Sequence, residues 1–131
     1  FEKARELAAW KKLMREEWDN IRVINYSFER TKDNVYRSGQ DYKAEIALNV
    51  QKIPKENVGV EFIITHMNKQ GEHQFVASEE FKLVRCKSGK CFYRANLVPE
   101  KAGSFFYGIR IYPKHKDLPH KQDFYLLRWI D

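Results

Sequence analysis

The chain has 131 residues, of which 43% are hydrophobic and 15% aromatic, so one ordered domain is expected and an intrinsically disordered chain is excluded. Lys and Arg outnumber Asp and Glu by 24 to 18. The two signs are interspersed, however, which is typical of a solvated surface and not of a nucleic-acid-binding stripe. No apolar run reaches membrane-spanning length, so no membrane partner is expected. Because the chain begins with Phe1 and not with Met, we expect it to be a piece of a longer polypeptide.

An amphipathic helix is predicted over residues 1–20, where the chain would join the rest of the longer polypeptide. Residues 1–19 contain neither Gly nor Pro, and their large apolar side chains recur at helical spacing on one stripe. Two indoles are costly to leave in water. The stripe must therefore pack on the following domain or on an absent part of the parent protein, and we take it as a helix docking face formed by Leu7, Trp10, Met14 and Trp18.

After Asn20 the apolar period changes from helical to two, which indicates strands with one buried face. Turn signals separate about seven short strands, and no helix-length segment lies between them. This spacing predicts an immunoglobulin-like antiparallel β-sandwich over residues 21–131. The expected strands are 21–28, 42–51, 58–64, one or two within 75–86, 92–98, 104–112 and 123–130.

Neither cysteines nor histidines form a motif with clear chemistry. Cys86 and Cys91 flank a hairpin loop, where we expect two ordinary thiols in a reducing cytoplasm, with a regulatory disulfide as the alternative. His115 and His120 stand in a polar loop at a spacing that suits neither a helix turn nor alternate strand positions. A solvated loop is the preferred interpretation.

No local pattern resembles a nucleophile elbow, a Gly-rich phosphate cradle or an acid/base carboxylate pair. We therefore assign no catalytic, cofactor-binding or metal-binding residue to this segment.

Aromatic residues are the richest feature of the late strands. On 104–112 the odd positions form the expected buried face, so Phe106, Arg110 and Tyr112 are expected to face outward, near Tyr125 or Trp129 if the last strand pairs beside them. Exposed aromatics with arginine can stack on sugar rings or bases. The alternative is that the lead helix or the parent domain covers them.

Two stretches together resemble a known family. The first runs from Ala4 to Lys12 (ARELAAWKK) and continues through Trp18 to Val23. The second comprises 103–113 (GSFFYGIRIYP), then His115 and finally 126–129 (LLRW). They resemble the C-terminal end of the bacterial and archaeal type of alpha-glucan (glycogen or maltodextrin) phosphorylase. In that family a closing helix of pattern LA-x-WK…W leads into an all-β tail with G-x-F-x-Y-x-x-R-x-x-P-x-H and a final W.

The resemblance implies a parent enzyme that uses phosphate to release glucose 1-phosphate from α-1,4-linked glucan, with pyridoxal phosphate as cofactor. The family's cofactor lysine and substrate-binding residues match no position here, so none is carried over. We expect a cytoplasmic, non-catalytic accessory domain that serves packing against the parent catalytic domain or contact within a homo-oligomer. The alternatives are an α-glucan-binding module and, less favoured, a basic nucleic-acid-binding β-domain.

Overall fold

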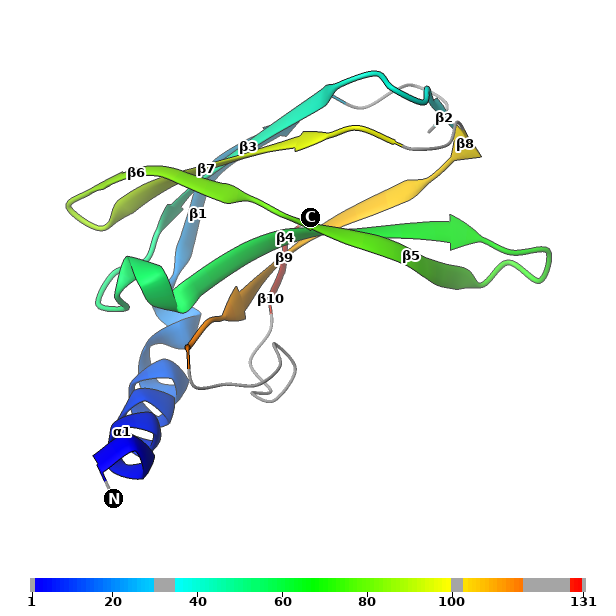
Figure 1. The fold of residues 1–131 in the computed structure, drawn as a ribbon. Coiled ribbons are helices and arrows are strands. Elements are labelled where there is room, and N and C mark those ends of the chain that lie inside the picture. Colours follow the sequence, from blue (N-terminus) through cyan, green and yellow to red (C-terminus); the bar gives the residue numbers. More distant parts are fainter. Residues whose placement is uncertain (1, 30–34, 100–102, 117–127, 131) are drawn as a thin grey trace.

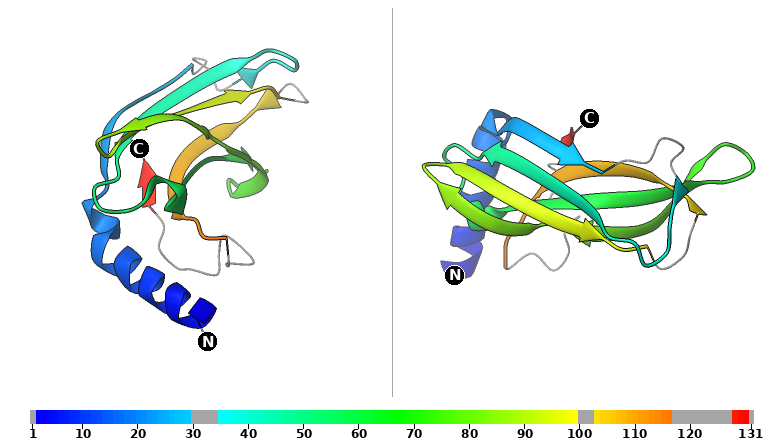
Figure 2. Two further views of the ribbon diagram at one scale, coloured as in Figure 1. Left: turned by 60° about the vertical axis from the view of Figure 1, so that its left-hand side comes forward. Right: turned by 90° about the horizontal axis from the view of Figure 1, so that it is seen from above.

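The computed structural model describes residues 2–29, 35–99, 103–116 and 128–130, and for β10 it describes the backbone alone. The chain begins with helix α1 (Glu2–Glu17) and a 3-10 turn, η1 (Trp18–Asn20). Glu2 in the first turn and Arg15 in the last turn both complement the helix dipole. The predicted helix is confirmed, and it leads into one end of a β-sandwich (Figures 1 and 2).

Two four-stranded antiparallel sheets form the sandwich within the described residues. The first sheet has the order β1-β3-β7-β6 and the second the order β10-β9-β4-β5. A two-stranded sheet, β2-β8, and a 3-10 turn, η2 (Lys55–Asn57), complete the described elements. The strand bounds are β1 (Arg22–Phe28), β2 (Val35–Tyr36), β3 (Tyr42–Asn49), β4 (Val58–Met67), β5 (His73–Glu80), β6 (Lys82–Lys87), β7 (Lys90–Leu97), β8 (Gly103–Ser104), β9 (Phe106–Pro113) and β10 (Arg128–Ile130).

The predicted antiparallel sandwich is confirmed, with eight strands in its two sheets among the described residues. The segment 75–86 contains two strands in different sheets, and the buried Phe81 lies at the crossing between them. The immunoglobulin-like part of the prediction stays a prediction. The sheet orders are compatible with it, because lettering β5 as C′ gives A-B-E-D and C′-C-F-G.

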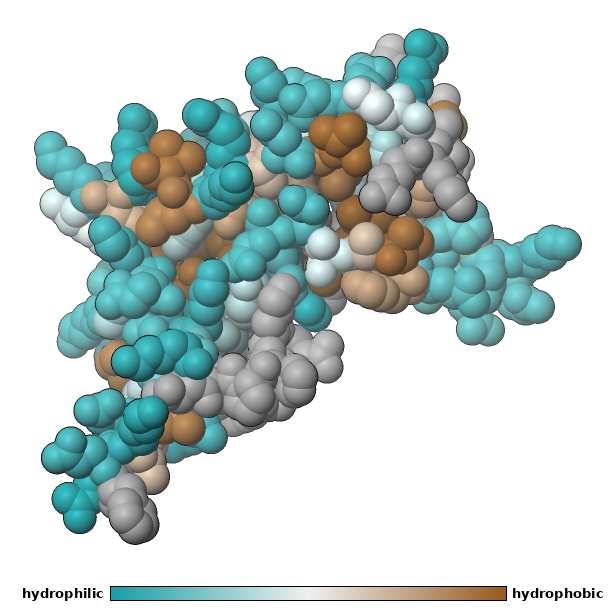
Figure 3. Space-filling view, in the orientation of Figure 1, coloured by the Kyte–Doolittle hydropathy of each residue, from teal (hydrophilic) through white to brown (hydrophobic). Residues whose placement is uncertain are grey.

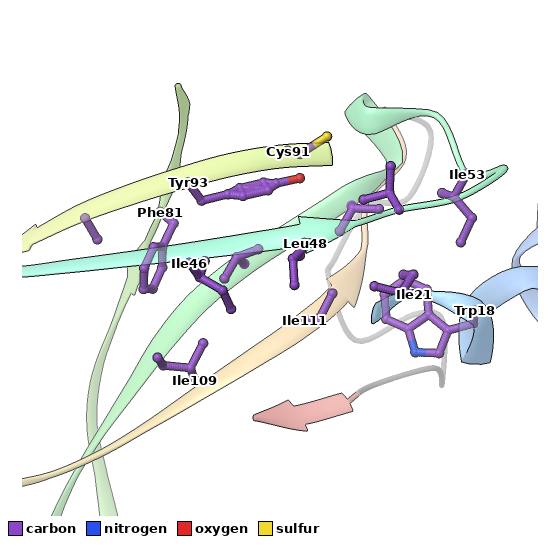
Figure 4. Packing of buried hydrophobic residues seen from close by; sticks show 14 of the residues in the cluster. Trp18, Ile21, Ile46, Leu48, Ile53, Phe81, Cys91, Tyr93, Ile109 and Ile111 are labelled. Carbon is purple, nitrogen blue, oxygen red and sulfur yellow. The ribbon is translucent and has the colours of Figure 1, made fainter. Parts of the chain in front are cut away.

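One hydrophobic cluster joins both sheets to the helix. Strand β7 alternates exposed and buried residues along its whole length, and β3 does so from Tyr42 to Ile46, so each contributes one apolar face to this core. Figure 4 shows Trp18 and Ile21 beside Leu48 and Ile111, and all four are at most 2% exposed. A smaller cluster at the other end of the sandwich contains Tyr36, Tyr42, Ile64 and Leu97. No helix among the described residues is long and apolar enough to cross a membrane.

Candidate functional site

The predicted docking face of the helix is buried within this chain. Trp10, Met14 and Trp18 are 7%, 0% and 2% exposed and belong to the main core cluster, against which the half-buried Leu7 also packs. The ring of Trp10 lies 4.7 Å from that of His115. Of the two alternatives drawn from the sequence, the structure shows the first: the stripe packs on its own sandwich. The parent catalytic region or a second subunit must therefore contact other surfaces of this chain.

The three histidines that the structure describes do not assemble into a site. His115 is half-buried beside Trp10, and His120 lies outside the described residues. His73 instead shares a hydrogen bond of 3.0 Å with Thr65 and contacts the ring of Phe106 edge-on. Among the described residues, no group of three or more His, Cys, Asp and Glu side chains is arranged to hold a metal ion.

The cysteine hairpin differs from expectation, because Cys86 and Cys91 form a disulfide where two thiols were predicted. They are directly paired on neighbouring strands β6 and β7, with their Cα atoms 4.1 Å apart. Antiparallel pairing brings opposite side chains close enough for this bond, so hairpin register and not cysteine count decides the pairing. Cys91 is buried and Cys86 packs against the main core cluster.

Reducing the disulfide is expected to lower the free energy of unfolding by about 2 kcal/mol and leave the fold intact, because the bond closes only a short loop. Urea unfolding with and without dithiothreitol measures the difference. The Cys86→Ser, Cys91→Ser double variant serves as the control, and its midpoint should not respond to the reductant. Loss of the β-rich circular dichroism spectrum on reduction would contradict this prediction.

A buried hydroxyl on β7, the strand that carries Cys91, makes the stability of the domain decline at alkaline pH. Tyr93 is 3% exposed, and its hydroxyl has no hydrogen-bond partner in the described part of the chain. Burial raises the pKa of Tyr93 from 10.0 to about 12. The unfolded chain therefore loses the phenol proton first, and stability that is complete below about pH 10 falls as the pH rises towards 12.

We expect Tyr93→Phe to make this alkaline decline shallower, by up to about 1.4 kcal/mol per pH unit between the two pKa values. Near neutral pH the variant should be as stable as the parent sequence or slightly more stable, because an unsatisfied buried hydroxyl is removed. Unfolding curves at several pH values above 9 provide the measurement. An unchanged slope would show that Tyr93 does not titrate on unfolding.

The predicted stacking surface is only partly assembled. Phe106 is 36% exposed on the outer face of the second sheet. Arg110 is directed to Glu61, with Nε 2.5 Å from Oε1. Tyr125 lies outside the described residues, and Trp129 is described by its backbone alone, which pairs opposite Arg110.

The expectation that Tyr112 is exposed is wrong, since only 2% of it is accessible. Tyr112 is paired directly with Gly59 on β4, and a Cβ built on Gly59 would lie 2.2 Å from the Tyr112 ring. The Tyr112 ring therefore fills the space that a side chain at position 59 would occupy. A tyrosine in this position is held flat on its own sheet and offers no face to a sugar.

A polar network surrounds this ring and was not predicted from the sequence. The Tyr112 hydroxyl donates to Glu80 at 2.6 Å, and the Lys114 ammonium lies 2.8 Å from the same oxygen. The neighbouring Glu61 is completely buried. Burial and then the hydrogen bond to Glu80 raise the pKa of Tyr112 far above its ordinary value, while Arg110 lowers it. Tyr112 thus stays a neutral hydrogen-bond donor, and the network ties β9 across β4 to β5.

Gly59→Ala is expected to displace the Tyr112 ring and to lower the free energy of unfolding by about 2 kcal/mol, because the new methyl group overlaps a buried, hydrogen-bonded side chain. Tyr112→Phe is the matched control: it keeps the ring and removes only the bond to Glu80, so it should cost about 1 kcal/mol. Chemical denaturation of both variants tests the order. A Gly59→Ala protein more stable than Tyr112→Phe would contradict it.

A cleft opens between the sheets beside edge strand β5. It has a volume of about 460 Å³ and is lined mainly by apolar side chains. The lining residues come from β4, β5, the end of β7 with the segment that follows it, and the start of β9; they include Ile64, Val76, Ala77, Ser78, Glu79, Leu97, Val98 and Tyr107. Figure 3 shows hydrophobic areas on this side of the molecule. No pattern in the sequence predicts this β5 cleft, because its walls are far apart along the chain.

The chain was also compared with known proteins. A family model described as the glycogen phosphorylase C-terminal domain matches residues 18–131. No curated protein and no solved structure matches the chain at the threshold applied. The matched range begins at Trp18, so it contains both sheets and the indole that ends the helix stripe.

Proposed function

The chain belongs to the glycogen phosphorylase C-terminal domain family, and from this premise we propose that it is a non-catalytic accessory domain of an alpha-glucan phosphorylase. The parent enzyme would cleave α-1,4-glucan with phosphate and release glucose 1-phosphate in the cytoplasm. The observation that carries the proposal is the family match over residues 18–131, which covers most of the chain.

Pyridoxal phosphate belongs to the proposed parent and not to this segment. A lysine that holds this cofactor as a Schiff base lies in an enclosed site. No described lysine is buried, and the described residues that line the β5 cleft include none. The described residues therefore do not fit the cofactor, and we assign them no step of the reaction.

We propose that the domain serves packing against the catalytic region or contact between subunits. The apolar stripe of α1 is already covered by the sandwich. Large apolar side chains nevertheless remain exposed on the strands, with Phe75 at 67% and Val76 at 49%. Exposed apolar residues that gather beside an open cleft are typical of interaction surfaces.

The test compares the full-length parent enzyme with a form that lacks residues 18–131. We expect the truncated enzyme to melt at a lower temperature or to form a smaller assembly, while its rate of glucose 1-phosphate release stays within about threefold. Release of glucose 1-phosphate by the 131-residue chain alone would contradict the proposal. So would unchanged melting and assembly after truncation.

Glucan binding is a second candidate, supported by one arrangement on the outer face of the second sheet. Phe75 on β5 and Phe106 on β9 are both register partners of Thr65 on β4, so the two exposed rings flank one hydroxyl. Affinity electrophoresis of the chain in glycogen tests this candidate. Retarded migration that is lost in Phe75→Ala and Phe106→Ala, but not in Phe92→Ala on the other sheet, would support it, and unretarded migration would exclude it.

A further inference from the structure

Strand β5 presents an open sheet edge. It ends the order of the second sheet, so within the described residues it pairs only with β4. All eight of its residues are exposed, and Phe75 is the most exposed large hydrophobic residue described. An unpaired strand of this length is a template for another strand.

The neighbouring edge strand β6 is protected in a way that β5 is not. Lys82, Arg85 and Lys87 place charge along β6, which disfavours pairing with another chain. On β5 the residues 73–78 carry no formal charge with histidine neutral, and the two carboxylates are confined to its end, at Glu79 and Glu80. The β5 edge also borders the apolar β5 cleft, which contains Val76 and Ala77.

From these features we infer that the β5 edge pairs with the β5 edge of a second copy of this chain, antiparallel and related by a two-fold axis. The inference rests on the proposed accessory role and names the surface that makes the subunit contact. Antiparallel pairing separates the acidic ends of the two strands, whereas parallel pairing would bring four carboxylates together. A single pair of eight-residue strand edges makes a small interface, so we expect the dimer to be weak and to depend on concentration.

The register of this pairing follows from an irregularity in β5. Phe75 pairs with Thr65 and Ala77 with Ile64, so Val76 is an extra residue without a partner in the β4–β5 register. At this bulge the alternation of side chains between the two faces of the sheet shifts by one position. By register Phe75 and Ser78 share the outer face, opposite Thr65 and Ile63, whereas Ala77 and Glu79 share the inner face, opposite Ile64 and Phe62. Val76 directly precedes Ala77 at the register shift, and the residues from 76 to 79 all line the cleft. Opposite residues must share a face.

A two-fold pairing that keeps the faces matched sets Phe75 against the partner's Ser78, Val76 against the partner's Ala77 and Gln74 against the partner's Glu79. Slipping the strands by one residue would oppose residues of different faces. In this register each Gln74 amide donates to a carboxylate of the other copy, twice per dimer. The strand is therefore self-complementary, as a two-fold interface requires.

Sedimentation equilibrium of the 131-residue chain between about 1 μM and 1 mM tests the dimer. We expect a mass rising from 15.7 kDa towards that of two chains.

Val76→Lys should weaken association at least about tenfold by placing two cations at the axis. Val84→Lys on β6 and Ile24→Lys on β1 are matched controls, because these residues are 49% and 46% exposed and also lie at register shifts. Both should associate as the parent sequence does.

Charge at position 74 tests the register. Gln74→Lys should strengthen association and Gln74→Glu should weaken it, each by about threefold or more, because the residue opposite is a carboxylate. A monomer at every concentration, or a dimer broken by a control and not by Val76→Lys, would overturn the inference. Equal effects of the two Gln74 variants would overturn the register. None of these results depends on the truncated-enzyme experiment, so failure of the dimer leaves the accessory role to be judged separately.

Discussion

Trp18→Ala is expected to lower the free energy of unfolding by about 3–5 kcal/mol, a large share of the stability of a domain of this size. Trp18 is 2% exposed and lies between the helix and both sheets, in contact with the cluster that contains Ile21, Leu48 and Ile111. Removing the indole leaves a cavity that neither sheet can close, because each is fixed by its strand pairing. Urea unfolding followed by tryptophan fluorescence and circular dichroism measures the loss.

Two companion variants separate burial from helix propensity. Lys12→Ala lies on the exposed face of α1 and should change stability by less than about 0.5 kcal/mol. Trp10 lies about two turns nearer the helix start and is 7% exposed, so Trp10→Ala should cost less than Trp18→Ala. If Trp18→Ala and Lys12→Ala had the same free energy of unfolding, the helix would not be part of the core. The apolar stripe would then be available to contact the parent catalytic region.

The sequence predicted those elements in which burial follows a simple period. Strand β7 alternates exposed and buried residues from end to end, and the helix stripe repeats at helical spacing. Each of these elements has one wet face, so the apolar pattern reports its orientation directly. The resemblance at the two ends of the chain added the family, which the match over residues 18–131 supports.

The surface of the second sheet was not predictable in the same way. Strand β4 is buried on both faces from Val58 to Ile64, so an alternating pattern no longer separates inside from outside. Tyr112 faces outward by its period but is buried, because register sets it against Gly59. The disulfide and the β5 cleft likewise depend on which strands meet, and strand pairing is a tertiary property.

Two ion pairs in this fold differ in burial, and burial should decide how much each contributes to stability. Glu61–Arg110 joins β4 to β9, and Glu45–Arg94 joins β3 to β7; in both, the residues are direct register partners on antiparallel strands. The first pair has side-chain exposures of 0% and 16%, the second of 58% and 56%. Their chemistry and strand geometry are therefore alike, and solvent access is what differs.

Arg110→Met is accordingly expected to lower the free energy of unfolding by about 3 kcal/mol, because it leaves the buried Glu61 carboxylate without its guanidinium. Arg94→Met should cost less than about 1 kcal/mol, since water solvates Glu45 when its partner is removed. The double variant Glu61→Gln, Arg110→Met should recover part of the loss, because the uncompensated charge disappears with its carboxylate. Denaturant unfolding of the three variants measures these differences. Equal losses for Arg110→Met and Arg94→Met would mean that water reaches Glu61 in solution, and the network that ties β9 to β5 would then contribute little to the stability of the second sheet.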